Sequence, residues 1–206
     1  MSTVETNPML GRFEAILSDY RLKPELFTMG NEAIVFGSAI IRTISNIIFP
    51  IGDLDCMTSA KGYVALEGAL LAAGYQLLPN NIKLRPGQAR CEYQFIVGDF
   101  ALRKFQLIIP DGVRKIDCII TNDLNQPFQT SIDNLLTGID LSICRGFYCD
   151  KLYHNHVEDI LDHKMYYLLP RTPTMTQLGR STKYYKHGFE PQGVLRALNH
   201  IKYVKL

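Results

Sequence analysis

The chain has 206 residues, 47% of them apolar and 20% charged, a balance typical of soluble globular proteins. The formal net charge of +2 is too small to require a nucleic-acid partner, and no apolar run is long enough to cross a bilayer. Five cysteines, an odd number without any Cys-x-x-Cys pair, argue against a disulfide framework and a structural zinc site, and predict a reducing, cytoplasmic setting.

Helices and strands alternate in the first part of the chain. Apolar residues at helical spacing predict a helix over 8–20, and the apolar run 33–36 predicts a buried strand. Ser38 is expected to cap a helix over 39–46. A strand through Asp53 and Asp55 follows, and then a helix over 61–73, with Gly74 as its left-handed cap.

Strand formers and turn signals dominate the middle of the chain. They predict a three-stranded meander over 90–97, 100–109 and 113–121, with turns at 98–99 and 110–112. A short helix over 131–137 and a strand over 139–148 come next, and helices over 155–168, 175–186 and 192–202 complete the chain. We expect an α+β fold in which residues 1–150 form a mixed sheet flanked by helices and residues 151–206 form a helical C-terminal extension packed on this core.

The most informative motif is Gly37-Ser38, followed by the two carboxylates of Asp53-Leu54-Asp55. Residues two apart on a strand point to the same face, so Asp53 and Asp55 would project side by side while Leu54 turns into the core. Adjacent carboxylates repel each other unless a cation lies between them, and a hard divalent cation with oxygen ligands is the usual solution. The pattern therefore predicts a metal site.

An apolar strand ending in Gly-Ser, a short helix and then Asp-x-Asp resembles the nucleotidyltransferase superfamily, which has the DNA polymerase beta-like fold. The resemblance implies transfer of a nucleoside monophosphate from a nucleoside triphosphate to an acceptor hydroxyl. It implies that Asp53 and Asp55 bind two Mg²⁺ (or Mn²⁺) ions and that Gly37 and Ser38 hold the triphosphate. Arg42 is the only cation in the 39–52 segment, which is longer than in the compact bacterial members, and we assign it to the nucleotide as well.

The same family pattern includes a third carboxylate on a later strand. Asp117 is the only acid in the apolar run 113–121, and a lone carboxylate is expensive to bury without a partner. We take Asp117 as the third metal ligand and as a catalytic residue that helps to activate the acceptor hydroxyl, with Asp140 as the alternative. Arg103, Lys104, Arg114 and Lys115 flank this region and either neutralise phosphate charge or simply protect a sheet edge.

Residues 171–186 hold several cations and no acid. On a helix Arg180 and Lys183 fall on one side, where they would bind a triphosphate or a nucleic-acid backbone, while Tyr184 or Tyr185 would stack on a base. The alternative is a solvated face whose tyrosines pack on the core. Both interpretations remain open.

The sequence thus supports a magnesium-dependent nucleotidyltransferase. The alternative is a catalytically inactive module of the same fold that binds a nucleotide or nucleic acid. The acceptor (RNA, protein or small molecule) is not determined by these residues, because one carboxylate site serves many acceptors.

Overall fold

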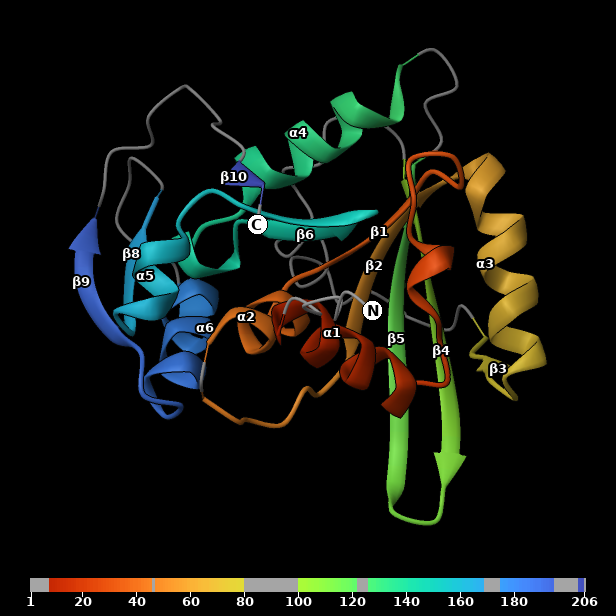
Figure 1. The fold of residues 1–206 in the computed structure, drawn as a ribbon, viewed down its shortest axis with the longest axis horizontal. Helices are drawn as coiled ribbons and strands as arrows, with labels where there is room; N and C mark the ends of the chain where they lie inside the picture. Colours follow the sequence, from red (N-terminus) through yellow and green to blue (C-terminus); the bar gives the residue numbers. More distant parts are fainter. Residues whose placement is uncertain are drawn as a thin grey trace, which may run out of the picture.

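The computed structural model describes residues 8–45, 47–79, 100–121, 126–168, 175–194 and 204–205. Eight strands form one sheet in the order β10-β7-β6-β1-β2-β5-β4-β3 (Figure 1). Their bounds are β1 Ala33–Phe36, β2 Leu54–Ser59, β3 Gln76–Leu77, β4 Phe100–Ile109, β5 Gly112–Thr121, β6 Gly146–Cys149, β7 Lys151–His154 and β10 Val204–Lys205. A second, two-stranded sheet pairs β8 (Lys164–Tyr167) with β9 (Glu190–Val194).

The helices are α1 (Pro8–Asp19), α2 (Ser38–Ile44), α3 (Ala60–Ala72), α4 (Phe128–Gly138), α5 (Val157–Leu161) and α6 (Met175–Tyr185), with short 3-10 turns at Pro24–Leu26 and Ser142–Cys144. Most pairings in the main sheet are antiparallel, but β2 and β5 run parallel. The expectation of an α+β fold with a mixed sheet flanked by helices is confirmed. None of the helices within the described residues combines the length and apolar character needed to cross a membrane.

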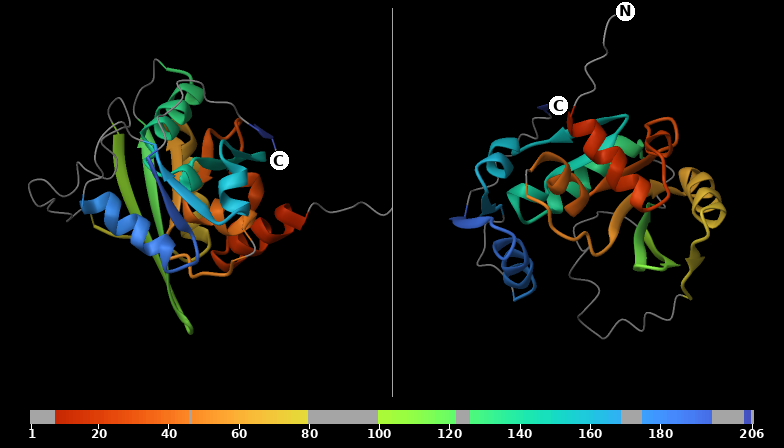
Figure 2. Two further views of the ribbon diagram at one scale, coloured as in Figure 1. Left: turned by 90° about the vertical axis from the view of Figure 1, so that its left-hand side faces the viewer. Right: turned by 60° about the horizontal axis from the view of Figure 1, so that its bottom comes forward.

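The two faces of the sheet are covered by different helices, as the turned views in Figure 2 show. Alternate residues such as Leu54 and Cys56 face a large core together with apolar side chains of α1, α2 and α3. The intervening residues, Met57 among them, face a smaller core under α4. Beyond the helices, β4 and β5 continue as a long two-stranded ribbon (Figure 1).

Several elements differ from the sequence-based expectation. The N-cap of α2 is Gly37, not Ser38, which is the first helical residue. The strand expected over 139–148 begins only at Gly146, because Ser142–Cys144 turns as a 3-10 helix. The first strand of the expected meander, 90–97, lies outside the described residues.

The helix expected over 155–168 is wrong. α5 ends at Leu161, His163 adopts a left-handed conformation with φ 56°, and Lys164–Tyr167 is a strand. Likewise the last helix was expected to begin at Gln192, but residues 192–194 belong to the partner strand β9, and the rest of 192–202 lies outside the described residues. Pairing between segments that are distant in sequence overrides the helical spacing of the local residues.

Residues 151–206 therefore contain strands as well as helices α5 and α6. The hairpin of β6 and β7 spans residue 150, so the two predicted units share one sheet. The division at residue 150 stays a prediction.

Candidate functional site

The turn between β1 and α2 brings the main chain against a carboxylate. Gly37 has φ 75° and ψ −141°, a conformation open essentially to glycine alone. A Cβ atom at this position would lie 2.6 Å from Oδ2 of Asp55. Glycine is thus required here both for its conformation and for its lack of a side chain. Ser38, the next residue, is buried at the start of α2.

Strand pairing sets three charged side chains in a line. Asp55 on β2 lies directly opposite Asp117 on β5, and Asp117 lies directly opposite Lys104 on β4. Lys104, Asp117 and Asp55 thus lie side by side across three neighbouring strands. Residues opposite each other in a sheet share a face, and this is the face that α4 covers two residues further along, at Met57 and Ile119. These three residues therefore lie just beyond the part of the sheet that α4 covers.

Burial and the neighbouring charges both alter the pKa of Asp55. Burial raises the pKa of Asp55 to about 8, and repulsion by Asp53 and Asp117 adds to this rise. Lys183 and Arg180 act in the opposite direction and lower the pKa. Two of the sequence-predicted aspartates, Asp53 and Asp117, therefore lie within electrostatic reach of the third, Asp55.

Asp117 is 8% exposed and forms an ion pair with the ammonium group of Lys104. Among the described residues no group of three or more His, Cys, Asp or Glu side chains is arranged to hold a metal ion. Like charges repel each other, and Lys104 already neutralises Asp117, so the three aspartates are not drawn together. Lys104 was only one of four cations noted in the sequence, but the cross-strand register singles it out.

Asp140, the alternative third carboxylate, is committed to another contact. It is 3% exposed and accepts a hydrogen bond from Nη1 of Arg180 at 2.7 Å. It does not lie opposite Asp55 in the sheet register. Asp117 is therefore the better candidate, and Asp140 anchors the cation-bearing helix α6.

The long segment between Gly37-Ser38 and Asp53 has a structural role that the sequence did not reveal. Phe49, 1% exposed, stacks on His187 at a centroid distance of 4.9 Å and meets Tyr184 edge-on. The segment thus holds the C-terminal end of α6 against the core. This docking keeps Arg180 and Lys183 close enough to affect Asp55.

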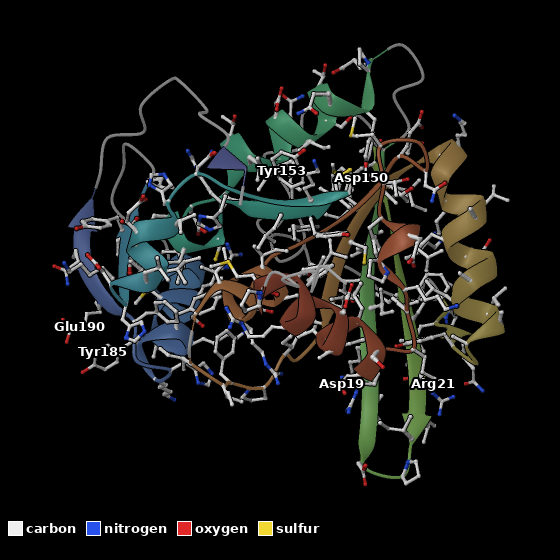
Figure 3. The ribbon with its side chains drawn as sticks, viewed as in Figure 1. Asp19, Arg21, Asp150, Tyr153, Tyr185 and Glu190 are labelled. Atoms are coloured by element: carbon white, nitrogen blue, oxygen red, sulfur yellow. The ribbon has the colours of Figure 1, made fainter. Side chains whose placement is uncertain are left out.

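The remaining residues predicted to contact a nucleotide differ in their contacts and in their exposure. Within the described residues, Arg42 makes no hydrogen bond or ion pair with the three aspartates, although it lies one turn after Ser38 in α2. Tyr184 is buried, whereas Tyr185 is 60% exposed and lies at the outer edge of the molecule near Glu190 (Figure 3). Of these two tyrosines, Tyr185 is the one accessible for stacking on a base.

No protein-family profile matches the sequence, and no curated protein is similar to it. Among solved structures, a CCA-adding enzyme in complex with CTP is similar, with 16% sequence identity and a TM-score of 0.45. The match covers 78% of this chain but only 35% of the enzyme, so the chain spans about a third of the length of the protein it matches. A similarity of this degree does not establish a function, which has to be argued from the residues of the site.

Proposed function

We propose that the chain is a divalent-metal-dependent nucleotidyltransferase that moves a nucleoside monophosphate from a nucleoside triphosphate to an acceptor hydroxyl. The observation that carries the proposal is the pairing of Asp55 with Asp117 on parallel strands, with the Gly37 turn against Asp55.

The residues present suit Mg²⁺ or Mn²⁺. Carboxylate oxygens are the ligands that these hard cations prefer. Burial raises the pKa of Asp55 to about 8 and repulsion by Asp53 and Asp117 adds to the rise, so the ionised carboxylate would be stabilised by a cation beside it. Asp53, Asp55 and Asp117 would hold the metal, which when bound would supply charge stabilisation at the phosphates and a more acidic acceptor hydroxyl.

The other residues have roles that follow from their positions. The acceptor oxygen bonds to the α-phosphorus while the bond from that phosphorus to the bridging oxygen breaks, and pyrophosphate leaves. Gly37 and Ser38 would lie along the triphosphate, with Arg42, Arg180 and Lys183 neutralising its charge. Asp117 would orient the acceptor hydroxyl and take its proton.

The decisive test replaces Asp53 and Asp55 together by Asn. Pyrophosphate release from labelled nucleoside triphosphates, in the presence of magnesium and a cell extract, should fall at least a thousandfold, while the circular dichroism spectrum is retained. Asp111→Asn, an exposed carboxylate at the tip of the β4–β5 ribbon, is the matched control and should keep full activity. Native-rate transfer by the double variant would overturn the proposal. The labelled product would also identify the acceptor as RNA, protein or small molecule.

A second function, a module that binds nucleotide without catalysis, is favoured by the ion pair of Lys104 with Asp117. That pair satisfies the third carboxylate without any metal. Under this alternative, ATP with magnesium would bind in calorimetry, the Asp53 and Asp55 substitutions would weaken binding, and no pyrophosphate would appear with any nucleoside triphosphate.

A further inference from the structure

Lys104 holds the carboxylate that the proposed reaction needs. It lies directly across from Asp117, and the two side chains form an ion pair. On its other side Asp117 faces Asp55. One carboxylate therefore sits between a built-in cation and the second carboxylate of the proposed metal site.

The ion pair is protected from water on its acidic side. The Asp117 side chain is 10% exposed and that of Lys104 is 35% exposed. Partial burial strengthens such a pair beyond the small value typical of fully exposed pairs, because water and salt screen it less. Removing the cation alone would leave a nearly buried carboxylate beside another acid, which is an unfavourable arrangement.

We propose that Lys104 is a positioning residue that competes with the divalent cation for Asp117 and thereby sets the metal affinity of the site. The proposal rests on the proposed function, because it takes Asp117 as a metal ligand. The lysine keeps the carboxylates in place when no metal is bound, and it must release Asp117 when the metal binds.

The proposal predicts that removing Lys104 increases the metal affinity, whereas a substitution in a binding site usually decreases it. Substituting Lys104 by Met removes both the competitor and a positive charge next to the metal, so the affinity for Mn²⁺ should increase about tenfold. A residue with only a structural role would lower the affinity or leave it unchanged when removed. The metal-free variant should also melt at a lower temperature, because Asp117 loses its partner.

The experiment titrates Mn²⁺ into the full chain and follows the free-ion signal by electron paramagnetic resonance. The variants are Lys104→Met, Lys104→Gln in case the first fails to fold, and Lys104→Arg, which keeps the charge and should bind as the wild type does. Lys115→Met is the matched control, since Lys115 lies on the same face of β5 two residues from Asp117 and is exposed. It removes the same charge without removing the ion pair, and its affinity should change less than twofold.

The outcomes separate this proposal from the proposed function. Tighter binding by Lys104→Met or Lys104→Gln, with the arginine and Lys115 variants near wild type, supports it. Equal tightening in Lys115→Met, or binding by the folded Lys104 variants that is unchanged or weaker, overturns the competition while leaving the metal site intact. Wild-type binding that does not depend on Asp55, tested with Asp55→Asn, overturns the metal site and the competition with it.

Discussion

Gly37 has no side chain, and this leaves room for the charged side chain of Asp55. It closes β1, has a φ of 75°, and leaves the space that Oδ2 of Asp55 occupies. Any larger residue must both adopt an unfavourable main-chain conformation and displace the carboxylate. Substitution at this position therefore affects stability and site geometry together.

We predict that Gly37→Ala lowers the free energy of unfolding by roughly 1–3 kcal/mol, the usual cost of such a conformation in a residue other than glycine. Urea denaturation with an unchanged m-value would measure the loss. Gly68→Ala is the matched control, because Gly68 is an exposed position in the middle of α3 where an added Cβ meets nothing within 4 Å. That change should stabilise the protein by roughly 0.5–1 kcal/mol. A Gly37 variant as stable as the wild type would show that the turn tolerates a side chain.

The element that most affects the candidate site is α6. Its cations Arg180 and Lys183 lower the pKa of Asp55. The helix is held in place because Phe49 stacks on His187 just after its C-terminal end and Asp140 pairs with Arg180 within it. Asp140 is nearly inaccessible, whereas a third of the Arg180 side chain remains exposed. Breaking this pair from one side leaves an uncompensated buried charge.

We predict that Arg180→Met destabilises the protein by about 3 kcal/mol, the lower end of the range for removing one partner of a buried pair. Adding Asp140→Asn to it should recover more than half of the loss, since the buried charge is then gone. Lys183→Met, an exposed cation one turn further along α6, is the control and should change stability by less than about 0.5 kcal/mol. Additive effects in this double-mutant cycle would mean that the pair does not anchor α6.

The elements that could be predicted from the sequence are those whose signals lie within the element itself. The Gly37 turn, the strand through Asp55, α1 and α6 follow from spacing and residue type, because their signals are local. The expected start of that strand at Asp53 is wrong, since β2 begins at Leu54 and Asp53 lies in the bend before it. The end of α5 at His163 was not predictable, since a left-handed histidine carries no sequence signal and β8 depends on β9, more than twenty residues later. The ion pair of Lys104 with Asp117 depends in the same way on cross-strand register.

At the scale of the whole molecule, the buried histidine of β7 links stability to pH. His154 is 1% exposed, and both ring nitrogens are engaged: Nε2 lies 3.0 Å from the carbonyl oxygen of Ile143, and Nδ1 accepts a hydrogen bond from the main-chain N–H of His156. The ring also lies against Gly146, where a Cβ would come within 2.2 Å of it. The neutral ring with its proton on Nε2 satisfies all of these contacts, and a second proton at Nδ1 would face an N–H group.

Burial lowers the pKa of His154 to about 4, against an unfolded value of 6.5. Between pH 6.5 and 4 the unfolded chain therefore takes up a proton that the folded chain refuses, so stability falls as the pH decreases through this window. The loss from this residue should reach about 3 kcal/mol near pH 4 and vanish above pH 7. Asp55 acts in the opposite direction, because its raised pKa means that the folded chain holds a proton which the unfolded chain releases.

Because the two groups oppose each other, the effect of His154 is measured as a difference between two proteins. His154→Gln keeps polar atoms at the end of the side chain but does not titrate, so it should be less stable than the wild type at pH 7.5 and should lose less stability between pH 6.5 and 4. Urea unfolding at half-unit pH intervals would show the two stability curves converging as the acidity increases. His156, two residues further along, lowers the pKa of His154, and burial lowers its own pKa as well, so His156→Gln should remove a smaller part of the pH dependence than His154→Gln does. Parallel curves for the wild type and His154→Gln would mean that the buried ring accepts a proton in the folded state without penalty.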